Sequence, residues 1–205
     1  MPRRPSTSLS TEPPARLRPL RDIVPRTQPQ PGSMSGPPAR PRLLLVGINP
    51  SVRSAEVGHH FASPGNPFWR LLHAAGLVTE PIGPTEDGRL VEWGLALTNL
   101  CPRPTRSAAE LRPEEMVAGR AALARKIARL RPDVVCFVGV TLYQAFFGGK
   151  GRKLSGGPGP KPERIAGARV FVVPNPSGLN ASFPGFAHKL VWYRRLQEFL
   201  EAPGE

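Results

Sequence analysis

Continuous runs of apolar residues mark four strands in the sequence from about residue 42 onward. None of these runs alternates apolar with polar positions, and such continuity is typical of strands buried on both faces of a parallel sheet. Segments with apolar residues at helical spacing separate the runs. The pattern therefore predicts an α/β fold, with parallel strands and helices on both faces of the sheet. The predicted strands cover residues 42–47, 95–98, 133–139 and 169–173.

Helices are predicted between these strands and after the last one. Asn66 is a suitable N-cap for the first helix, because Pro67 follows at the first helical position and Gly76 stands where the apolar spacing ends. Pro113, followed by two glutamates, begins the longest helix. The predicted helices cover about residues 67–75, 85–93, 113–130, 140–147 and 184–201.

Two of the segments between the predicted strands and helices have a distinctive composition. The stretch from Asn49 to Asn66 is longer than an ordinary connection and contains two adjacent histidines and an aromatic residue, so we expect a specialised loop there. Residues 148–167 are rich in Gly, Pro and Lys, which indicates a mobile loop with a short β excursion.

Polar residues stand where three of the predicted strands end. Asn49 follows the first strand, Asn99 the second, and the segment Asn175–Asn180 the fourth. Gly47 permits a sharp turn after the first strand, and Pro50 prevents that strand from continuing. Parallel strands present their carboxyl ends at one edge, where α/β proteins bind ligands. We therefore expect these three segments to meet at one cleft.

The first 41 residues differ in composition from the rest of the chain. Up to Arg42 there are eleven Pro, eight Arg and only two acidic residues. So many prolines and so little apolar surface predict a disordered basic arm, residues 1–41, ahead of a folded domain over residues 42–202. Scattered apolar residues at Leu17–Val24 indicate that this part docks on the domain. The arm is either a salt-sensitive contact to phosphates or an inert linker, including a product of a mis-chosen start codon.

The charge of the chain indicates a polyanionic partner. The 205 residues carry a formal net charge of +13, with a pI of about 11.2. Such an excess favours nucleic acid first and an anionic membrane surface second. No apolar stretch approaches the length of a membrane span, and the basic N-terminus lacks the apolar region of a secretory signal, so we expect a cytoplasmic protein.

The two cysteines exclude several kinds of site. Cys101 and Cys136 lie far apart, and they can form neither a disulfide framework nor a four-thiolate zinc or iron–sulfur centre. His59 and His60 are adjacent but have no third ligand nearby in the sequence, so we expect no metal site and no cofactor.

Two segments resemble the motifs of a known family. Gly47-Ile48-Asn49-Pro50, followed by Phe61-Ala62-Ser63-Pro64-Gly65-Asn66-Pro67-Phe68-Trp69, is similar to the first motif of the mismatch-specific uracil/thymine-DNA glycosylases. Asn175-Pro176-Ser177-Gly178-Leu179-Asn180 resembles their second motif, the loop that enters DNA. Thr98-Asn99 with Arg103-Pro104-Thr105 fits the middle segment. The similarity covers about residues 42–200.

This resemblance implies a fold and an activity. The fold would be a three-layer α/β/α sandwich with a short, mainly parallel central sheet. The activity would be hydrolytic removal of uracil from double-stranded DNA, with thymine and damaged pyrimidines as further substrates and guanine as the opposite base. Classical uracil-DNA glycosylases carry an Asp and a His where this chain has Asn49 and Asn175, and the iron–sulfur branches need four cysteines.

The resemblance also implies roles for residues of the first motif. Asn49 would be the catalytic residue, positioning a water rather than deprotonating it, because an amide is a poor base. The base pocket would include Ile48, Gly58, Phe61 and Asn99. Backbone N–H groups at Ile48 and Phe61 would stabilise the departing base, and the Phe61 ring would stack on it. Asn99 contacts the base or the water, or it only caps the strand end.

The second motif would act on the DNA duplex. Leu179 is the wedge that fills the gap left by a flipped nucleotide, or else a turn residue folded into the core. Gly178 and Asn180 would contact the opposite guanine, although relatives often have Ser-Arg where this chain has Asn180-Ala181. Ser177 is a phosphate contact or a turn hydroxyl. Lys150, Arg152 and Lys153 either track phosphates or belong to a solvated loop.

The sequence therefore leaves three alternative functions. The first is a monomeric, cofactor-free DNA glycosylase, the second a non-catalytic nucleic-acid-binding module on the same fold, and the third an α/β enzyme that binds a free nucleotide. The order of preference among uracil, thymine and damaged bases depends on pocket shape and is not readable from the sequence.

Overall fold

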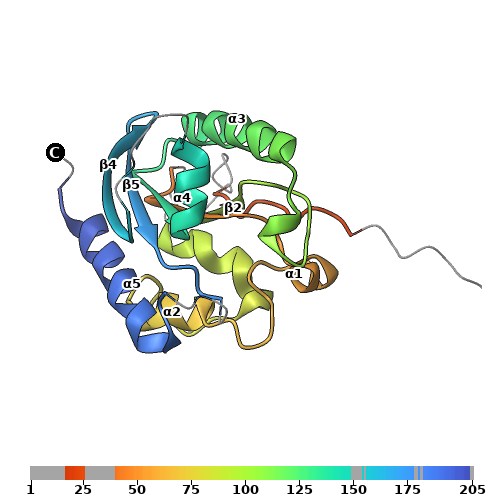
Figure 1. Cartoon of the computed structure of the whole chain (residues 1–205). Coiled ribbons are helices and arrows are strands. Elements are labelled where there is room, and N and C mark those ends of the chain that lie inside the picture. The colour runs from red at the N-terminus through yellow and green to blue at the C-terminus, as the bar shows by residue number, and fades with distance from the viewer. Residues whose placement is uncertain are drawn as a thin grey trace, which may run out of the picture.

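The computed structural model describes residues 17–25, 40–148, 154, 156–177, 180 and 182–203. Strands and helices alternate along the chain, as the hydrophobic pattern predicts (Figure 1). The strands are β1 (Leu43–Gly47), β2 (Leu95–Asn99), β3 (Val134–Val138), β4 (Gly159–Ile165) and β5 (Ala168–Val173). The helices are α1 (Val52–Val57), α2 (Phe68–Ala74), α3 (Pro113–Leu130), α4 (Val140–Phe147) and α5 (Gly185–Glu201), with 3₁₀ segments η1 (Pro84–Trp93) and η2 (Ala108–Glu110).

One five-stranded sheet forms the centre of the fold, with strand order β2-β1-β3-β5-β4. The first four of these strands are parallel, and β4 pairs antiparallel with β5 at one edge. The chain goes from β1 outward to β2 on one side and then continues from β3 on the other side of β1. The strand order therefore reverses between β1 and β3, which is where open α/β sheets bind their ligands.

The alternating residues of β1 show how the two faces of the sheet are covered. Leu43 and Leu45 belong to the apolar cluster that includes α2 and α5, whereas Leu44 and Val46 belong to the cluster that includes α3 and α4. All four side chains are fully buried. Helices thus cover both faces (Figure 1), and the predicted three-layer α/β/α sandwich with a mainly parallel sheet is confirmed.

Two elements differ from the sequence-based prediction. Residues 52–57 form α1 inside the stretch expected to be a loop, because the hydroxyl of Ser51 accepts the N–H of Ser54 and caps a helix too short to show a period. The β excursion expected in residues 148–167 is the full strand β4. Its prolines, Pro160 and Pro162, are tolerated because β4 lies at the sheet edge.

The N-terminal segment 17–25 lies on the domain, as expected for Leu17–Val24. Ile23 and Leu97 exchange two backbone hydrogen bonds of 2.9 and 2.8 Å, so the segment pairs with the free edge of β2. The rest of the expected arm, residues 1–16 and 26–39, lies outside the described residues. In the part of the chain described here, every helix is too short or too polar to cross a membrane.

Candidate active site

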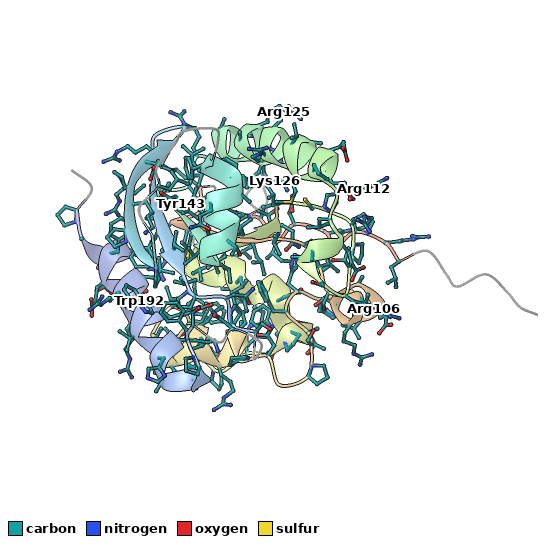
Figure 2. The ribbon with its side chains drawn as sticks, viewed as in Figure 1. Arg106, Arg112, Arg125, Lys126, Tyr143 and Trp192 are labelled. Carbon is teal, nitrogen blue, oxygen red and sulfur yellow. The ribbon has the colours of Figure 1, made fainter. Side chains whose placement is uncertain are left out.

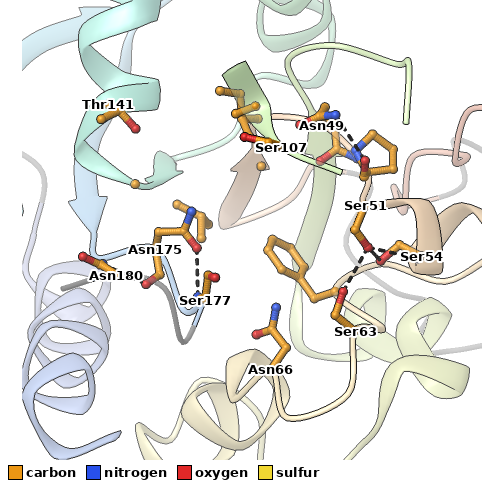
Figure 3. Close-up of a pocket in the computed structure, with 18 of the residues that line it drawn as sticks. Asn49, Ser51, Ser54, Ser63, Asn66, Ser107, Thr141, Asn175, Ser177 and Asn180 are labelled. Carbon is orange, nitrogen blue, oxygen red and sulfur yellow. Dashed lines mark hydrogen bonds between the residues drawn. The ribbon is translucent and has the colours of Figure 1, made fainter. Parts of the chain in front are cut away.

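A cleft of about 1030 Å³ opens at the carboxyl edge of the parallel strands. The ends of β1, β2, β3 and β5 all contribute to its lining, through Gly47, Asn99, Val138 and Pro174 among others. Asn49, Asn99 and Asn175 are far apart in the sequence but line this one cleft, so the predicted convergence is confirmed. Figure 3 shows Asn49 and Asn175 in the pocket.

The side-chain amide of Asn49 is held by three acceptors. Its Nδ2 donates to the carbonyl oxygen of Arg103 at 3.0 Å, to that of Pro50 at 3.2 Å and to the hydroxyl of Thr105 at 2.7 Å. Carbonyl oxygens only accept, so the nitrogen and not the oxygen must face them. The orientation of the amide is therefore fixed, and among the described residues no donor contacts its Oδ1.

The segment that follows β2 supplies two of these acceptors, Arg103 and Thr105, because backbone hydrogen bonds join it to the end of β1. Leu100 and Cys101 donate their N–H groups to the carbonyls of Gly47 and Ile48, both at 2.8 Å. Thr105 donates its own hydroxyl to the carbonyl of Ser107 at 2.7 Å, which leaves its oxygen lone pairs for Asn49. The position of Asn49 thus depends on a segment about fifty residues further along the chain.

Phe61 supplies an aromatic wall of the cleft. Its ring stacks on that of Phe68, with centroids 3.8 Å apart and planes inclined by 16°. The backbone of Phe61 has φ 50°, a left-handed conformation that is uncommon for an aromatic residue. Strained conformations of this kind persist where the surrounding structure enforces them, commonly at functional sites. Among the described residues, nothing accepts the backbone N–H of Phe61.

Gly47 makes room for the side chain of Asn99. A Cβ atom on Gly47 would lie 2.5 Å from Oδ1 of Asn99 and 3.4 Å from the ring of Phe61. The two residues are register partners in the parallel pair of β1 and β2. The missing side chain of Gly47 therefore brings the amide of Asn99 and the ring of Phe61 against the same wall of the cleft.

His60 holds the other side of Asn99. It is almost fully buried, and its Nε2 lies 2.9 Å from the carbonyl oxygen of Arg21. Because that carbonyl only accepts, Nε2 carries the proton, and Nδ1 accepts from the amide of Asn99 at 3.4 Å. Burial lowers the pKa of His60, which keeps the ring neutral at pH 7. The role of His60 is thus to orient Asn99.

His59 is held on the outside of the same loop. Its Nδ1 lies 3.2 Å from Oδ1 of Asp87, and the other oxygen of that buried carboxylate accepts the backbone N–H of His60 at 3.0 Å. The two histidines are thus anchored to η1. No group of three or more potential metal ligands occurs in the described parts of the chain.

Hydroxyl groups tie the loop before α2 to α1. Ser51 bonds to the hydroxyls of Ser54 and Ser63 at 3.0 and 3.1 Å, and Ser54 accepts the N–H of Ala62 at 3.1 Å (Figure 3). This network fixes the chain that directly follows the left-handed Phe61. Ser51 therefore joins the two ends of the pocket loop.

The loop after β5 begins as a closed turn. Oδ1 of Asn175 accepts the N–H of Ser177 at 2.9 Å, and Nδ2 of Asn180 donates to the carbonyl of Asn175 at 3.0 Å (Figure 3). Ser177 and Asn180 line the cleft as well. Two hydrogen bonds within the segment therefore hold this turn.

Six of the seven expected site residues that the structure describes line this cleft. Ile48, Asn49, Phe61, Asn99, Ser177 and Asn180 are among its walls. Gly58 is not: it is exposed and ends α1 in a left-handed conformation with φ 80°, so we remove it from the pocket. Gly178, Leu179, Lys150, Arg152 and Lys153 lie outside the described residues.

The sequence left the functions of three further residues unassigned. Thr105 orients Asn49, His60 orients Asn99, and Arg106 lies exposed on the cleft wall. Thr105 and His60 act through contacts between distant segments, which no local pattern reveals. Arg106 follows the motif residue Thr105 directly, and its charge was the only available signal.

No acidic side chain lines the cleft among the described residues. The site therefore offers a fixed amide oxygen, an aromatic face and a second oriented amide, without a carboxylate to act as general base. This arrangement suits a flat, uncharged heterocycle stacked on Phe61, together with a water molecule bonded to Asn49.

Such a fold and site place the chain among the α/β proteins that bind ligands at the carboxyl ends of parallel strands. Residues 34–197 match the model of the uracil DNA glycosylase superfamily, and the chain belongs to that family. It is also similar to a G/U mismatch-specific uracil DNA glycosylase of Schizosaccharomyces pombe, with 36% identity over 162 residues. The match covers 74% of this chain and 49% of that protein, so the chain spans about half the length of the curated relative it matches.

Proposed function

We propose that this chain is a monofunctional DNA glycosylase that removes uracil from double-stranded DNA and leaves an abasic site. The observation that carries the proposal is the amide of Asn49, whose nitrogen is fixed by three acceptors. Among the described residues, no donor contacts its oxygen and no acid lines the cleft, so the oxygen is left for a water. The similarity to a G/U mismatch-specific enzyme supports guanine as the preferred opposite base.

The chemistry of base removal explains why an amide is sufficient. Breaking the bond between uracil and deoxyribose leaves the sugar with oxocarbenium character, as in glycoside hydrolysis. Such an electrophile needs a water in the right place more than a strong base. Oδ1 of Asn49 accepts a hydrogen bond from that water and directs its lone pair toward the sugar carbon. Without a general base, we expect a slow hydrolase.

The departing base carries negative charge on its oxygens. Backbone N–H groups stabilise such charge when they are already aimed at it. The N–H of Phe61, which has no acceptor among the described residues, is suited to this task, and that of Ile48 lies on the same cleft wall. Asn99 presents a fixed donor and acceptor to the edge of the base, and the ring of Phe61 stacks on its face.

The target base lies inside the duplex, so the nucleotide must flip out before it reaches the cleft. We assign Leu179 to the wedge that replaces it, with Gly178 and Asn180 at the opposite guanine and Ser177 at a phosphate. The formal net charge of +13 supports binding to the DNA backbone. Thymine and damaged pyrimidines remain further candidate substrates.

A duplex oligonucleotide with a single G·U pair tests this function. At enzyme concentrations well above that of the DNA, the full chain should convert the strand to an abasic product that alkali cleaves. Asn49→Ala should bind the same duplex with similar affinity but lose most of the turnover, because only the water is lost. Unchanged turnover of Asn49→Ala would remove the assigned mechanism.

Other results of the same assay would identify other functions. Tight binding of the G·U duplex by the wild-type chain without any abasic product would indicate a non-catalytic binding module. Cleavage of free deoxyuridine without cleavage of the duplex would indicate an enzyme acting on free nucleosides. Parallel duplexes with A·U and G·T pairs measure the preference for the opposite base and for the excised base.

A further inference from the structure

We infer that residues Leu20–Val24, here called the strap, complete the base pocket by fixing the orientation of His60 and, through it, of Asn99. The inference rests on the proposed function, because it concerns the pocket in which uracil would bind. The strap lies before residues 34–197, the part matched by the family model. Its contacts to the pocket come from its backbone and from one side chain.

The strap is anchored to the edge of the sheet like a short additional strand. Ile23 and Leu97 exchange two backbone hydrogen bonds, and their neighbours alternate between the two faces. Ile23 packs against the apolar cluster under α2 and α5, whereas Val24 packs against the cluster under α3 and α4. The free edge of β2 is thus covered by the strap.

A closed polar triangle holds the strap from the side of α3. The carboxylate of Asp22 accepts from the hydroxyl of Thr98 at 2.5 Å and pairs with Nζ of Lys126 at 2.6 Å. Lys126 also donates to the hydroxyl of Thr98 at 2.7 Å. Thr98 is fully buried, and the two charged groups are mostly shielded from water. The triangle therefore holds Asp22 in place beside the backbone pair of Ile23 and Leu97.

The strap enters the pocket at two points. The carbonyl oxygen of Arg21 accepts Nε2–H of His60, and the half-buried Leu20 lines the cleft itself. The carbonyl decides the tautomer of His60: with the proton on Nε2, the lone pair of Nδ1 faces the amide nitrogen of Asn99. His60 and the backbone of Arg21 are therefore positioning groups, and Asn99 is the residue that faces the base.

Without the strap, His60 would lose the carbonyl acceptor that holds the proton on Nε2. Either ring nitrogen would carry the proton, and the amide of Asn99 would lose the acceptor that distinguishes its nitrogen from its oxygen. Uracil presents a donor at N3 between two carbonyl oxygens, so a rotated Asn99 would offer the wrong edge. We expect the excision rate to fall by about tenfold, the effect of one misplaced hydrogen bond.

Ile23→Pro in the full chain tests the strap, because proline removes the N–H that bonds to Leu97 without deleting any residue. Leu17→Pro is the matched control, since Leu17 is exposed and precedes the strap. Single-turnover excision of uracil from a G·U duplex should slow by about tenfold in Ile23→Pro and should stay within about twofold of wild type in Leu17→Pro. Asp22→Asn, which keeps the volume but loses the pairing with Lys126, should give an intermediate rate.

The state of the His60 ring gives a readout that a purely structural role would not change. In the wild-type chain, the ¹⁵N shifts of His60 should report Nε2–H, and the pKa of His60 should be below 6.5 because the ring is buried. The titratable groups around it are Asp22 of the strap, Asp87 of η1 and His59. Ile23→Pro should admit water, mix the two tautomers and raise the pKa toward 6.5, and the acid limb of the excision rate should move with it.

The results separate the two proposals. The role of the strap would be overturned if Ile23→Pro and Asp22→Asn both kept the wild-type tautomer of His60 and the wild-type excision rate. The same conclusion would follow if these variants melted at a lower temperature but kept that tautomer and that rate. If Ile23→Pro does not fold, Asp22→Asn decides alone. If the wild-type chain excises no uracil, the proposed function fails, whereas the tautomer measurement still tests the strap.

Discussion

Asn49 donates its side-chain amide to the hydroxyl of Thr105 across 2.7 Å, although 56 positions separate the two residues. The hydroxyl of Thr105 is itself committed as a donor to the carbonyl of Ser107. Each hydrogen in this short chain therefore has one possible direction, from Asn49 to Thr105 and from Thr105 to Ser107. The free oxygen of Asn49 is a consequence of this order.

Thr105→Val should lower the excision rate more than it lowers stability. The valine keeps the shape of the side chain but removes one acceptor from Asn49, so the amide gains rotational freedom. We expect a loss of about two- to tenfold in single-turnover rate on a G·U duplex, corresponding to one neutral hydrogen bond. Thr105→Ser retains the hydroxyl and should stay close to wild type. Equal losses in the two variants would assign the effect to packing.

Asn49→Asp should be slower than wild type, although a carboxylate is the stronger base. Its second oxygen would replace the nitrogen that now faces the carbonyls of Arg103 and Pro50, at 3.0 and 3.2 Å. Two acceptors would then meet without a proton between them, and a buried polar group left in this way is destabilised. We expect a rate about tenfold or more below wild type at neutral pH. A faster Asn49→Asp variant would show that a carboxylate at position 49 can activate the water in this site.

Gly47→Ala should impair the site while leaving the fold intact. The new methyl group would lie 2.5 Å from Oδ1 of Asn99, so the amide of Asn99, a side-chain group, would shift rather than the backbone. The melting temperature should therefore change little, whereas uracil excision should drop by about tenfold. Gly88→Ala, where nothing lies within 4 Å of the new methyl group, is the control and should match wild type in both measurements. A Gly47→Ala variant with full activity would remove the role of Asn99.

The sheet and its helices were predictable because the apolar runs are continuous and end at polar turn residues. Four aliphatic residues before Gly47 require burial on both faces, and only a sheet covered by helices provides it. The six residues of α1 escaped prediction because they complete less than two turns and show no period. The strand β4 escaped because its prolines and its alternating exposure resemble a loop.

The site was predictable only in part, for a different physical reason. Asn49 and Asn99 could be placed from the ends of their strands, since parallel strands share an edge. The orientation of each amide depends instead on Thr105, Arg21 and His60, which reach the site from separate segments. Such contacts exist only once the chain is folded, and spacing along the sequence carries no trace of them.

Stability in acid should depend on Glu115. Its carboxylate accepts from the guanidinium of Arg103 at 2.6 and 2.7 Å, and this contact lowers the pKa of Glu115 from 4.5 to about 2. A depressed pKa stabilises the fold above the unfolded value, and the contribution is lost as the pH falls from about 4.5 to 2. Arg103 also offers its carbonyl to Asn49, so the same contact supports the site.

Melting curves of Glu115→Gln between pH 2.5 and 7 check this expectation. The variant should melt at a lower temperature than wild type at pH 6. The difference should shrink toward pH 2.5, because Glu115 of the unfolded wild-type chain is then protonated and must lose its proton to form the ion pair. Glu114→Gln, which is exposed and adjacent, should follow wild type across the range. A constant difference between Glu115→Gln and wild type would mean that the carboxylate acts through shape rather than charge.

Arg106 should contact a DNA phosphate at the edge of the cleft. The side chain is exposed, lines the cleft beside Thr105 and forms no ion pair with any described residue. Arg125 is equally exposed but lies on α3, away from the cleft lining (Figure 2). Each phosphate neutralised on binding contributes about 0.9 to the slope of log K against log salt concentration.

Binding of a G·U duplex to Asn49→Ala, measured from low to moderate salt, reports the phosphate contacts without interference from catalysis. Adding Arg106→Gln should reduce the slope by about one and weaken binding at low salt, whereas Arg125→Gln should leave the slope unchanged. An unchanged slope with Arg106→Gln would place the DNA backbone elsewhere. A reduction of similar size in both variants would mean that the chain attracts DNA through its overall charge, with no fixed phosphate contact at the cleft.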